Sequence, residues 1–315
     1  MRRVLVFAAA VLALAGCGGG HPVAPPSVVV SLDFIPNAVH APIYTAVRKH
    51  RDLQHGIRLQ IRKPAAGPDA LKLVASGRVD LGVLDIHDLA IARERGADLV
   101  AIGALVARPL AALIARPDIR RPRALEGHTV GVSGLPSDPA FLRAIVEYDG
   151  GRFDRVRQVT IGFSAVSRLL SGRVDAVPAF WNAEGVALKR HGLAVHEFRV
   201  DDYGAPPYPE VVLIAARRTL DDHRDRVERA LAAIRDGLRD TLADPAAAAA
   251  QIARAAETPD VGLVRAQLDA VAPIFAPGLR LRRSVLDDWA DFDLRIGIVD
   301  RRPDVARAFD FTVLH

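Results

Sequence analysis

Two short segments of this chain gather aromatic and polar side chains where an apolar run gives way to a helix-like pattern. The first contains Asp33, Phe34, Asn37, His40 and Tyr44. A helix that opens with His40 carries Tyr44 one turn further along the same face. An acid and an aromatic residue at the end of a strand, followed by such a helix, make this segment a candidate binding element.

Residues 180–185 repeat the arrangement after a later apolar run. Trp181 and Glu184 are three residues apart at a helix start, hence on one side of it. The indole is a platform for stacking, and the carboxylate accepts hydrogen bonds from amino groups, so the pair suits an aminated aromatic heterocycle. The alternative is structural: Trp181 packs in the core, and Glu184 is a first-turn acid stabilised by the helix dipole.

Common catalytic and cofactor-binding motifs are missing from the sequence. It holds no His-Glu-x-x-His, no Gly-x-x-x-x-Gly-Lys and no Gly-x-Gly-x-x-Gly after its first strand, and residues 131–134 are not the Gly-x-Ser-x-Gly elbow of hydrolases. Asp85, His87 and Asp88 offer metal-binding atoms, but neighbouring residues that enter a helix point in different directions. We therefore expect capping and solvation there, and we predict no metal, no cofactor and no enzymatic activity.

The composition is that of a globular protein. The chain has 315 residues, of which 50% are hydrophobic, 25% charged and 5% aromatic. This length suits two domains of ordinary size. The formal net charge of +5 is spread along the chain as isolated arginines. Nucleic-acid surfaces need clustered charge with interleaved aromatic rings, so we expect no nucleic-acid partner.

The N-terminal residues have the layout of an export signal. A basic start is followed by an uncharged apolar run over residues 4–13 and by Leu-Ala-Gly up to Cys17, the single cysteine. This run is too short for a permanent membrane span. The last four residues look like the bacterial lipoprotein box, which predicts a signal peptide at 1–16 and a lipidated flexible tether at 17–27. An ordinary signal peptide or a buried cysteine is the alternative.

From residue 28 onward, short β-branched runs alternate with helical patterns. Strands are expected at 28–32, 57–61, 81–84, 100–106, 129–132, 156–161, 176–178 and 211–215, with helices between most of them and a mainly helical segment from residue 219. Alternation of this kind predicts an α/β fold of mostly parallel sheets flanked by helices.

A short repeated segment suggests that the fold has two similar lobes. Ser-Gly-Arg-Val-Asp occurs at residues 76–80 and again at 171–175, each time where a helix ends and a strand follows. The alternative is a chance match, helped by the residue preferences that all helix-to-strand connections share. Chain crossings near 107–116 and 204–215 would place a ligand cleft between the lobes. We expect lobe 1 at 28–115, lobe 2 at 116–212, and a return to lobe 1 with C-terminal helices at 213–315.

Three motifs resemble those of a known family. Residues 32–40 resemble the Leu-Asp-Trp-x-Pro-Asn-x-x-His opening of solute-binding lipoproteins that supply ABC transporters with thiamine-pyrimidine precursors, and residues 131–138 and 180–186 look like their second-lobe motifs. The resemblance implies a two-lobed type II periplasmic-binding-protein fold that closes on formylaminopyrimidine or hydroxymethylpyrimidine. It also implies delivery to a membrane permease with its ATPase, by a monomer anchored to the cell membrane and facing the periplasm or cell exterior.

The same resemblance assigns the ligand-binding residues. The first-lobe wall would comprise Asp33, Phe34, Asn37, His40 and Tyr44, with Trp181 and Glu184 facing it from the second lobe. The further expected contacts are Ser137, Asp85 and Tyr203.

Three other functions remain open. Some members of the family carry riboflavin, whose ring suits the same stacking and hydrogen bonding. The fungal relatives make the thiamine pyrimidine from pyridoxal phosphate and a histidine, and His40 matches that histidine's motif position. However, residues 82–89 hold no lysine for the cofactor, and Cys17 is the only cysteine for an iron motif. A surface lipoprotein without a transport role would bind no small molecule tightly.

Overall fold

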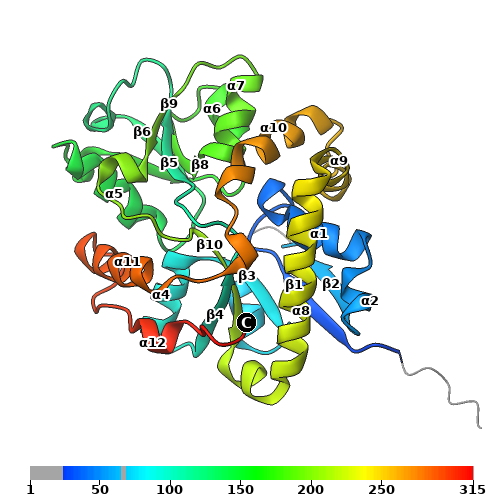
Figure 1. Cartoon of the computed structure of the whole chain (residues 1–315). Coiled ribbons are helices and arrows are strands. Elements are labelled where there is room, and N and C mark those ends of the chain that lie inside the picture. The colour runs from blue at the N-terminus through cyan, green and yellow to red at the C-terminus, as the bar shows by residue number, and fades with distance from the viewer. Residues whose placement is uncertain (1–23, 65–68, 315) are drawn as a thin grey trace, which may run out of the picture.

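Two five-stranded sheets organise the molecule, one in each lobe (Figure 1). The computed structural model describes residues 24–64 and 69–314. The predicted signal peptide and the lipidation residue Cys17 lie outside these residues. Each sheet is covered by helices, so the predicted two-lobed α/β fold is confirmed.

The two sheets share one topology. In the first, the strand order is β2-β1-β3-β10-β4, and in the second it is β7-β6-β8-β5-β9. The first comprises β1 (Ser27–Ser31), β2 (Arg58–Arg62), β3 (Leu81–Asp85), β4 (Leu99–Ala104) and β10 (Val211–Ala216). The second comprises β5 (Ala111–Ala115), β6 (Thr129–Val132), β7 (Arg157–Thr160), β8 (Ala176–Phe180) and β9 (His196–Arg199).

Both sheets are mixed but mostly parallel, as expected: four strands of each run in one direction and one runs against them. β10 runs antiparallel to β3 and β4, and β5 runs antiparallel to β8 and β9. Each of these two strands directly follows a chain crossing and has no helix before it to reverse its direction. β5 also belongs to the second sheet, although we expected residues up to 115 in lobe 1. Its Ala-Ala-Leu-Ile-Ala sequence was interpreted as part of the crossing, which in fact ends before residue 111.

Helices fill the segments between strands. Those of the first half are α1 (Ala41–Arg48), α2 (Arg51–Gln54), α3 (Ala70–Ala75), α4 (Ile86–Glu94), α5 (Asp138–Tyr148), α6 (Ala165–Leu170) and α7 (Val186–Arg190). The C-terminal ones are α8 (Arg217–Ala243), α9 (Pro245–Ala255), α10 (Val261–Val271), α11 (Arg283–Arg295) and α12 (Val305–Ala308). Short helical turns include η1 (Ala38–His40), η4 (Trp181–Gly185) and η5 (Val200–Tyr203). Within the described part of the chain, no helix combines the length and apolarity that crossing a membrane requires.

The repeated Ser-Gly-Arg-Val-Asp segment has the same role in both lobes. Gly77 and Gly172 end the preceding helices with positive φ angles of 69° and 67°, which glycine adopts without a steric penalty. A carboxylate oxygen of Asp80 accepts a hydrogen bond from the backbone of Val29 at 2.7 Å, and Asp175 accepts one from Thr129 at 2.8 Å. Asp80 therefore fastens β3 to β1, and Asp175 fastens β8 to β6.

The C-terminal helices contact both lobes. α8 packs along α1, and α10 lies against α7 and η4 of the second lobe. Gln267 on α10 donates a side-chain hydrogen bond to the carbonyl of Ala183 in η4. α11 supplies Trp289 and Asp293, both fully buried, beside α4. The segment that resembles the family least thus supports the elements around the cleft.

The contact between α8 and α1 yields a stability test. A methyl group at Gly237 would overlap the carbonyl oxygen of Pro42 and the backbone of Ala46. We expect Gly237→Ala to lower the free energy of unfolding by about 1–3 kcal/mol, because the two helices must separate. Chemical denaturation measures it.

The matched control is Gly262→Ala, near the start of α10, where the new methyl group meets the movable end of Arg190. This change should be neutral or slightly stabilising, because alanine favours helix. Equal effects of the two substitutions would contradict the close helix contact.

Candidate functional site

A cavity of about 450 Å³ lies between the two lobes. Its first-lobe side is built from the loop after β1 and the β3–α4 junction, and its second-lobe side from the loops after β6 and β7 and from η4. The lining carries many more acids than bases. The acidic members are Asp33, Asp85, Asp88, Asp138, Glu184 and Glu210, against Lys72, His87 and Arg95 among the described residues.

A chain of two hydrogen bonds fixes the side chain of Asp33, which follows β1. The backbone N–H of Asn37 donates to Nδ1 of His40 at 3.2 Å, so the ring carries its proton on Nε2. Nε2 in turn donates to Asp33 at 2.8 Å. His40 is 1% exposed and does not itself line the cavity. It positions Asp33, whereas Asp33 and Asn37 reach the cavity surface.

Aromatic rings from both lobes meet at the cavity. The ring centroids of Phe34, after β1, and Phe163, after β7, are 4.0 Å apart, and both side chains line the cavity. Tyr44 packs instead against the core of the first lobe, and burial raises its pKa to about 12. The geometry thus leaves Tyr44 outside the lining and adds Phe163, which the sequence analysis missed.

An internal carboxylate organises the loop after β6. Asp138, at the start of α5, accepts hydrogen bonds from the Ser133 hydroxyl and from the backbone N–H groups of Gly134 and Leu135, at 2.8–3.1 Å. Ser137 is buried and lines the cavity. The loop N–H groups that could bind an external anion are therefore already occupied.

The second-lobe pair separates into one cavity residue and one packing residue. Glu184 lines the cavity and accepts a hydrogen bond from the backbone of Phe180 at 3.1 Å, and burial raises the pKa of its carboxyl group. Trp181 donates its indole N–H to the carbonyl of Pro109 at 3.2 Å, and the guanidinium of Arg199 lies 4.2 Å from its ring centroid. Trp181 is partly buried and is not among the residues that line the cavity.

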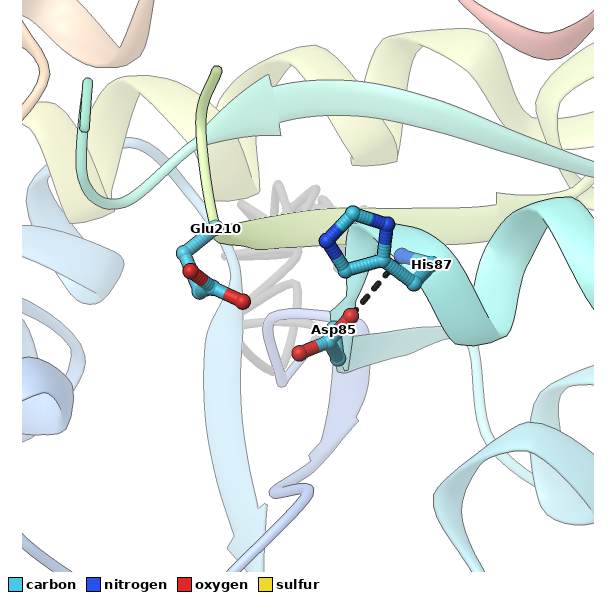
Figure 2. A group of neighbouring side chains, drawn as sticks. All are labelled: Asp85, His87 and Glu210. Carbon is cyan, nitrogen blue, oxygen red and sulfur yellow. Dashed lines mark hydrogen bonds between the residues drawn. The ribbon is translucent and has the colours of Figure 1, made fainter. Parts of the chain in front are cut away.

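The floor of the cavity contains a cluster of titratable groups (Figure 2). Asp85 caps α4 by accepting the backbone N–H of His87 at 2.8 Å, which confirms the predicted capping role, whereas the expected solvation is wrong for His87 and Asp88, each 2% exposed. Burial and the charge of Asp85 raise the pKa of Asp88 to about 8. Burial alone would lower the pKa of His87, but the hydrogen-bonded carboxylate of Asp293, helped by Asp85 and Glu210, raises it to about 10.

Glu210, immediately before β10, joins the two chain crossings. It is fully buried, and one carboxylate oxygen accepts the backbone N–H groups of Leu110 and Ala111 at 2.8 and 3.1 Å. These two residues end the first crossing, whereas Glu210 belongs to the second. No sequence motif marks Glu210, because its partners lie about 100 residues away.

One predicted contact lies apart from the cavity. The ring of Tyr203 in η5 packs edge-on against Tyr148 at the end of α5 and Phe198 in β9. Its neighbour on the chain, Gly204, has a φ of 85° and turns the backbone toward the second crossing. Tyr203 is not among the residues that line the cavity.

The chain matches the protein family described as NMT1/THI5 like over residues 37–248, about two thirds of its length. It belongs to this family.

Two relatives differ in the activity that their names give. The chain is 33% identical over 219 residues to the formylaminopyrimidine-binding protein of Halalkalibacterium halodurans, covering 68% of this chain and 66% of that protein, just under two thirds. It is 24% identical over 278 residues to the 4-amino-5-hydroxymethyl-2-methylpyrimidine phosphate synthase of Aspergillus parasiticus, covering 83% and 80%.

A solved structure shares the fold. The alkanesulfonate-binding protein SsuA from Xanthomonas axonopodis pv. citri matches with a TM-score of 0.73 and 17% identity, over 91% of this chain and 98% of that one. At this identity the match concerns the fold alone, and it agrees with the periplasmic-binding-protein architecture expected from the sequence.

Glu184 yields a prediction for the pH dependence of stability. Because burial raises the pKa of its carboxyl group, the unfolded chain releases this proton at a lower pH than the folded chain. Stability is therefore lost as the pH rises from the unfolded-state pKa, about 4, through the raised folded-state value. Glu184→Gln removes this loss and keeps an oxygen that can accept the Phe180 N–H.

We expect the melting temperature of Glu184→Gln, relative to the unmodified protein, to increase between about pH 4 and pH 8. Calorimetry across this range measures the difference. The control is Glu257→Gln, at an exposed ion pair with Lys63, where the raised-pKa contribution is missing. A constant difference for Glu184→Gln would argue against a buried carboxyl group.

Proposed function

We propose that this chain is the substrate-binding lipoprotein of an ABC importer and that it captures a thiamine pyrimidine precursor, formylaminopyrimidine or hydroxymethylpyrimidine. The formylaminopyrimidine-binding relative and the periplasmic-binding-protein fold support a substrate-binding role. The specific ligand rests on the chemistry of the cavity.

The observation that carries this proposal is an acidic cavity between two lobes with aromatic rings on its surface. Asp33 and Glu184 face it from opposite lobes, so hydrogens of an aminopyrimidine can be accepted on both sides. Phe34 and Phe163 supply apolar faces for a flat ring. Carboxylates accept hydrogen bonds from amino groups, which aminopyrimidines present.

The cavity is poorly suited to anions. Acidic side chains outnumber basic ones on its surface, and Asp138 occupies the N–H groups of the loop after β6. A phosphate or sulfonate placed there would meet mainly carboxyl groups and would lack the loop N–H donors that Asp138 occupies. This disfavours pyridoxal phosphate, and hence the synthase reaction, and it favours an uncharged or cationic ligand. The segment 82–89 also carries no lysine beside the cavity.

Capture would proceed by closure of the lobes. A ligand that contacts both lobes stabilises the arrangement in which they approach each other. Phe34 and Phe163 are placed to report this approach, since they come from opposite lobes and touch. The closed monomer would then dock on the permease, whose separate ATPase drives import.

A thermal-shift titration tests the ligand. The full chain carrying Cys17→Ser would be titrated with hydroxymethylpyrimidine, formylaminopyrimidine, thiamine, riboflavin and pyridoxal phosphate. We expect a pyrimidine precursor to stabilise the protein by about 2.7 kcal/mol at 100 times its Kd. Glu184→Gln and Phe34→Ala should each weaken this binding at least tenfold, since each removes a direct contact.

Glu257→Gln serves as the control, because its carboxylate is exposed and far from the cavity lining. Stabilisation by riboflavin alone would retain the transport role and replace the ligand. That outcome is disfavoured because the carbonyl edge of the flavin ring would face carboxylates. The absence of any shift would overturn the proposed capture of a precursor and favour a surface role without transport.

The proposed location depends on Cys17. Lipidation of its side chain after removal of residues 1–16 would hold the protein on the outer side of the cell membrane. We expect Cys17→Ser to move the protein from the membrane fraction to the soluble fraction. Mass spectrometry of the unmodified protein should find Cys17 at the N-terminus with attached acyl chains. A membrane-bound Cys17→Ser variant would contradict this anchor.

A further inference from the structure

Three potential metal ligands converge at the floor of the cavity. Asp85 ends β3, His87 lies in the first turn of α4, and Glu210 precedes β10. One ligand atom from each lies within 4.8 Å of the other two. The sequence offered only the first two, which a helix start would normally point apart. Figure 2 shows that Glu210 completes the group from the opposite side.

Two of these side chains hold buried polar atoms without a hydrogen-bonding partner outside this group of three. Nε2 of His87 makes no hydrogen bond among the described residues, although His87 is 2% exposed, and Oε1 of the fully buried Glu210 has no donor there apart from the neighbouring carboxyl group of Asp85. The ring nitrogen of His87 that lies away from its backbone is directed toward Glu210 (Figure 2). Burying such atoms without a partner is costly, so they point to something that binds there.

The far side of the His87 ring is arranged as in a metal site. Nδ1 lies 2.6 Å from a carboxylate oxygen of Asp293, which is fully buried on α11. The indole N–H of Trp289 approaches the same nitrogen at the longer distance of 3.3 Å. The shorter contact assigns the Nδ1 proton to a hydrogen bond with Asp293, so Nε2 is the nitrogen that can bind a metal ion, which displaces the Nε2 proton of the ring. Histidines that ligate metals commonly donate their other N–H to a carboxylate in this way.

We propose that Asp85, His87 and Glu210 bind a divalent transition-metal ion, with Zn²⁺ as the representative case. One imidazole nitrogen and two carboxylates suit Zn²⁺ better than Mg²⁺ or Ca²⁺, which prefer oxygen ligands alone. The ion also offsets the negative charge that these acids bring into a buried place. Three protein ligands leave a fourth position open, and all three residues line the cavity, so this position faces the ligand space.

Metal binding to the full chain carrying Cys17→Ser tests the proposal. Isothermal titration with Zn²⁺ should give one tight site per chain. Glu210→Gln and His87→Gln should each weaken it at least tenfold, because each removes a ligand atom at nearly constant size. Asp293→Asn should weaken it roughly 10–100-fold, as loss of a partner that orients a ligating histidine does.

Glu184→Gln is the matched control, since it removes one carboxylate from the same cavity but outside the three ligands. It should retain Zn²⁺ binding. Substitution by Co²⁺ gives an independent readout: bound Co²⁺ should show strong visible absorption of a low-coordinate site, which Glu210→Gln should abolish. Circular dichroism shows whether each variant is folded.

Two results would overturn the proposal: no Zn²⁺ site in the unmodified cavity, or equal Zn²⁺ binding by all variants, which would indicate surface histidines. The outcome is distinct from that of the ligand titration. Pyrimidine binding that survives Glu210→Gln, with Zn²⁺ binding lost, would retain the transport proposal and the metal site together. Pyrimidine binding lost in Glu210→Gln, with no Zn²⁺ site, would show that an amino group of the ligand occupies this position instead.

Discussion

The carboxylate of Glu210 holds together the two segments on which the arrangement of the lobes depends. It accepts hydrogen bonds from the backbone of Leu110 and Ala111, where the first crossing enters β5 of the second sheet, while Glu210 itself immediately precedes β10 of the first. A charged group buried at this depth is tolerated only when it is hydrogen-bonded or paired. The positions of both crossings, and hence of the cavity between them, follow from this constraint.

The same requirement explains the other buried acids. Asp138 is satisfied by one hydroxyl and two backbone donors, Asp293 by His87, and Asp33 by His40. In each case the partner fixes a loop or a ring that borders the cavity. Rigid polar surroundings of this kind reduce the cost of ordering the site when a ligand enters, because the acceptors are already in place.

The sequence allowed the fold and part of the site to be predicted because these features are local. The pairing of Asp33 with His40 and the capping role of Asp85 involve partners a few residues away. The aspartates at 80 and 175 were recognised because the same five-residue sequence occurs at equivalent positions in the two lobes. Glu184 was identified because it follows a strand at helix spacing.

Features set by distant parts of the chain could not be predicted in this way. Trp181 has the same local pattern as a stacking residue, but the carbonyl that it contacts belongs to Pro109. Phe163 is a single aromatic residue in a loop, and it gains a role only because Phe34 lies opposite. β5 was missed since an alanine-rich strand after a crossing has no periodicity to distinguish it. The convergence of Glu210 on Asp85 and His87 likewise depends on the crossings alone.

The insertion of β10 between β3 and β4, after the whole second sheet in sequence, has a consequence for the order in which the protein can fold. The second sheet is built from one continuous stretch, residues 111–199, whereas β4 joins the first sheet only through β10, which arrives after that stretch. A chain that emerges from its N-terminus therefore can complete lobe 2 while lobe 1 still has an unpaired edge at β3. Pairing between strands more than 100 residues apart is slow because a long loop must close first. This topology predicts that lobe 1, and with it the cavity residue Glu210, is completed after lobe 2.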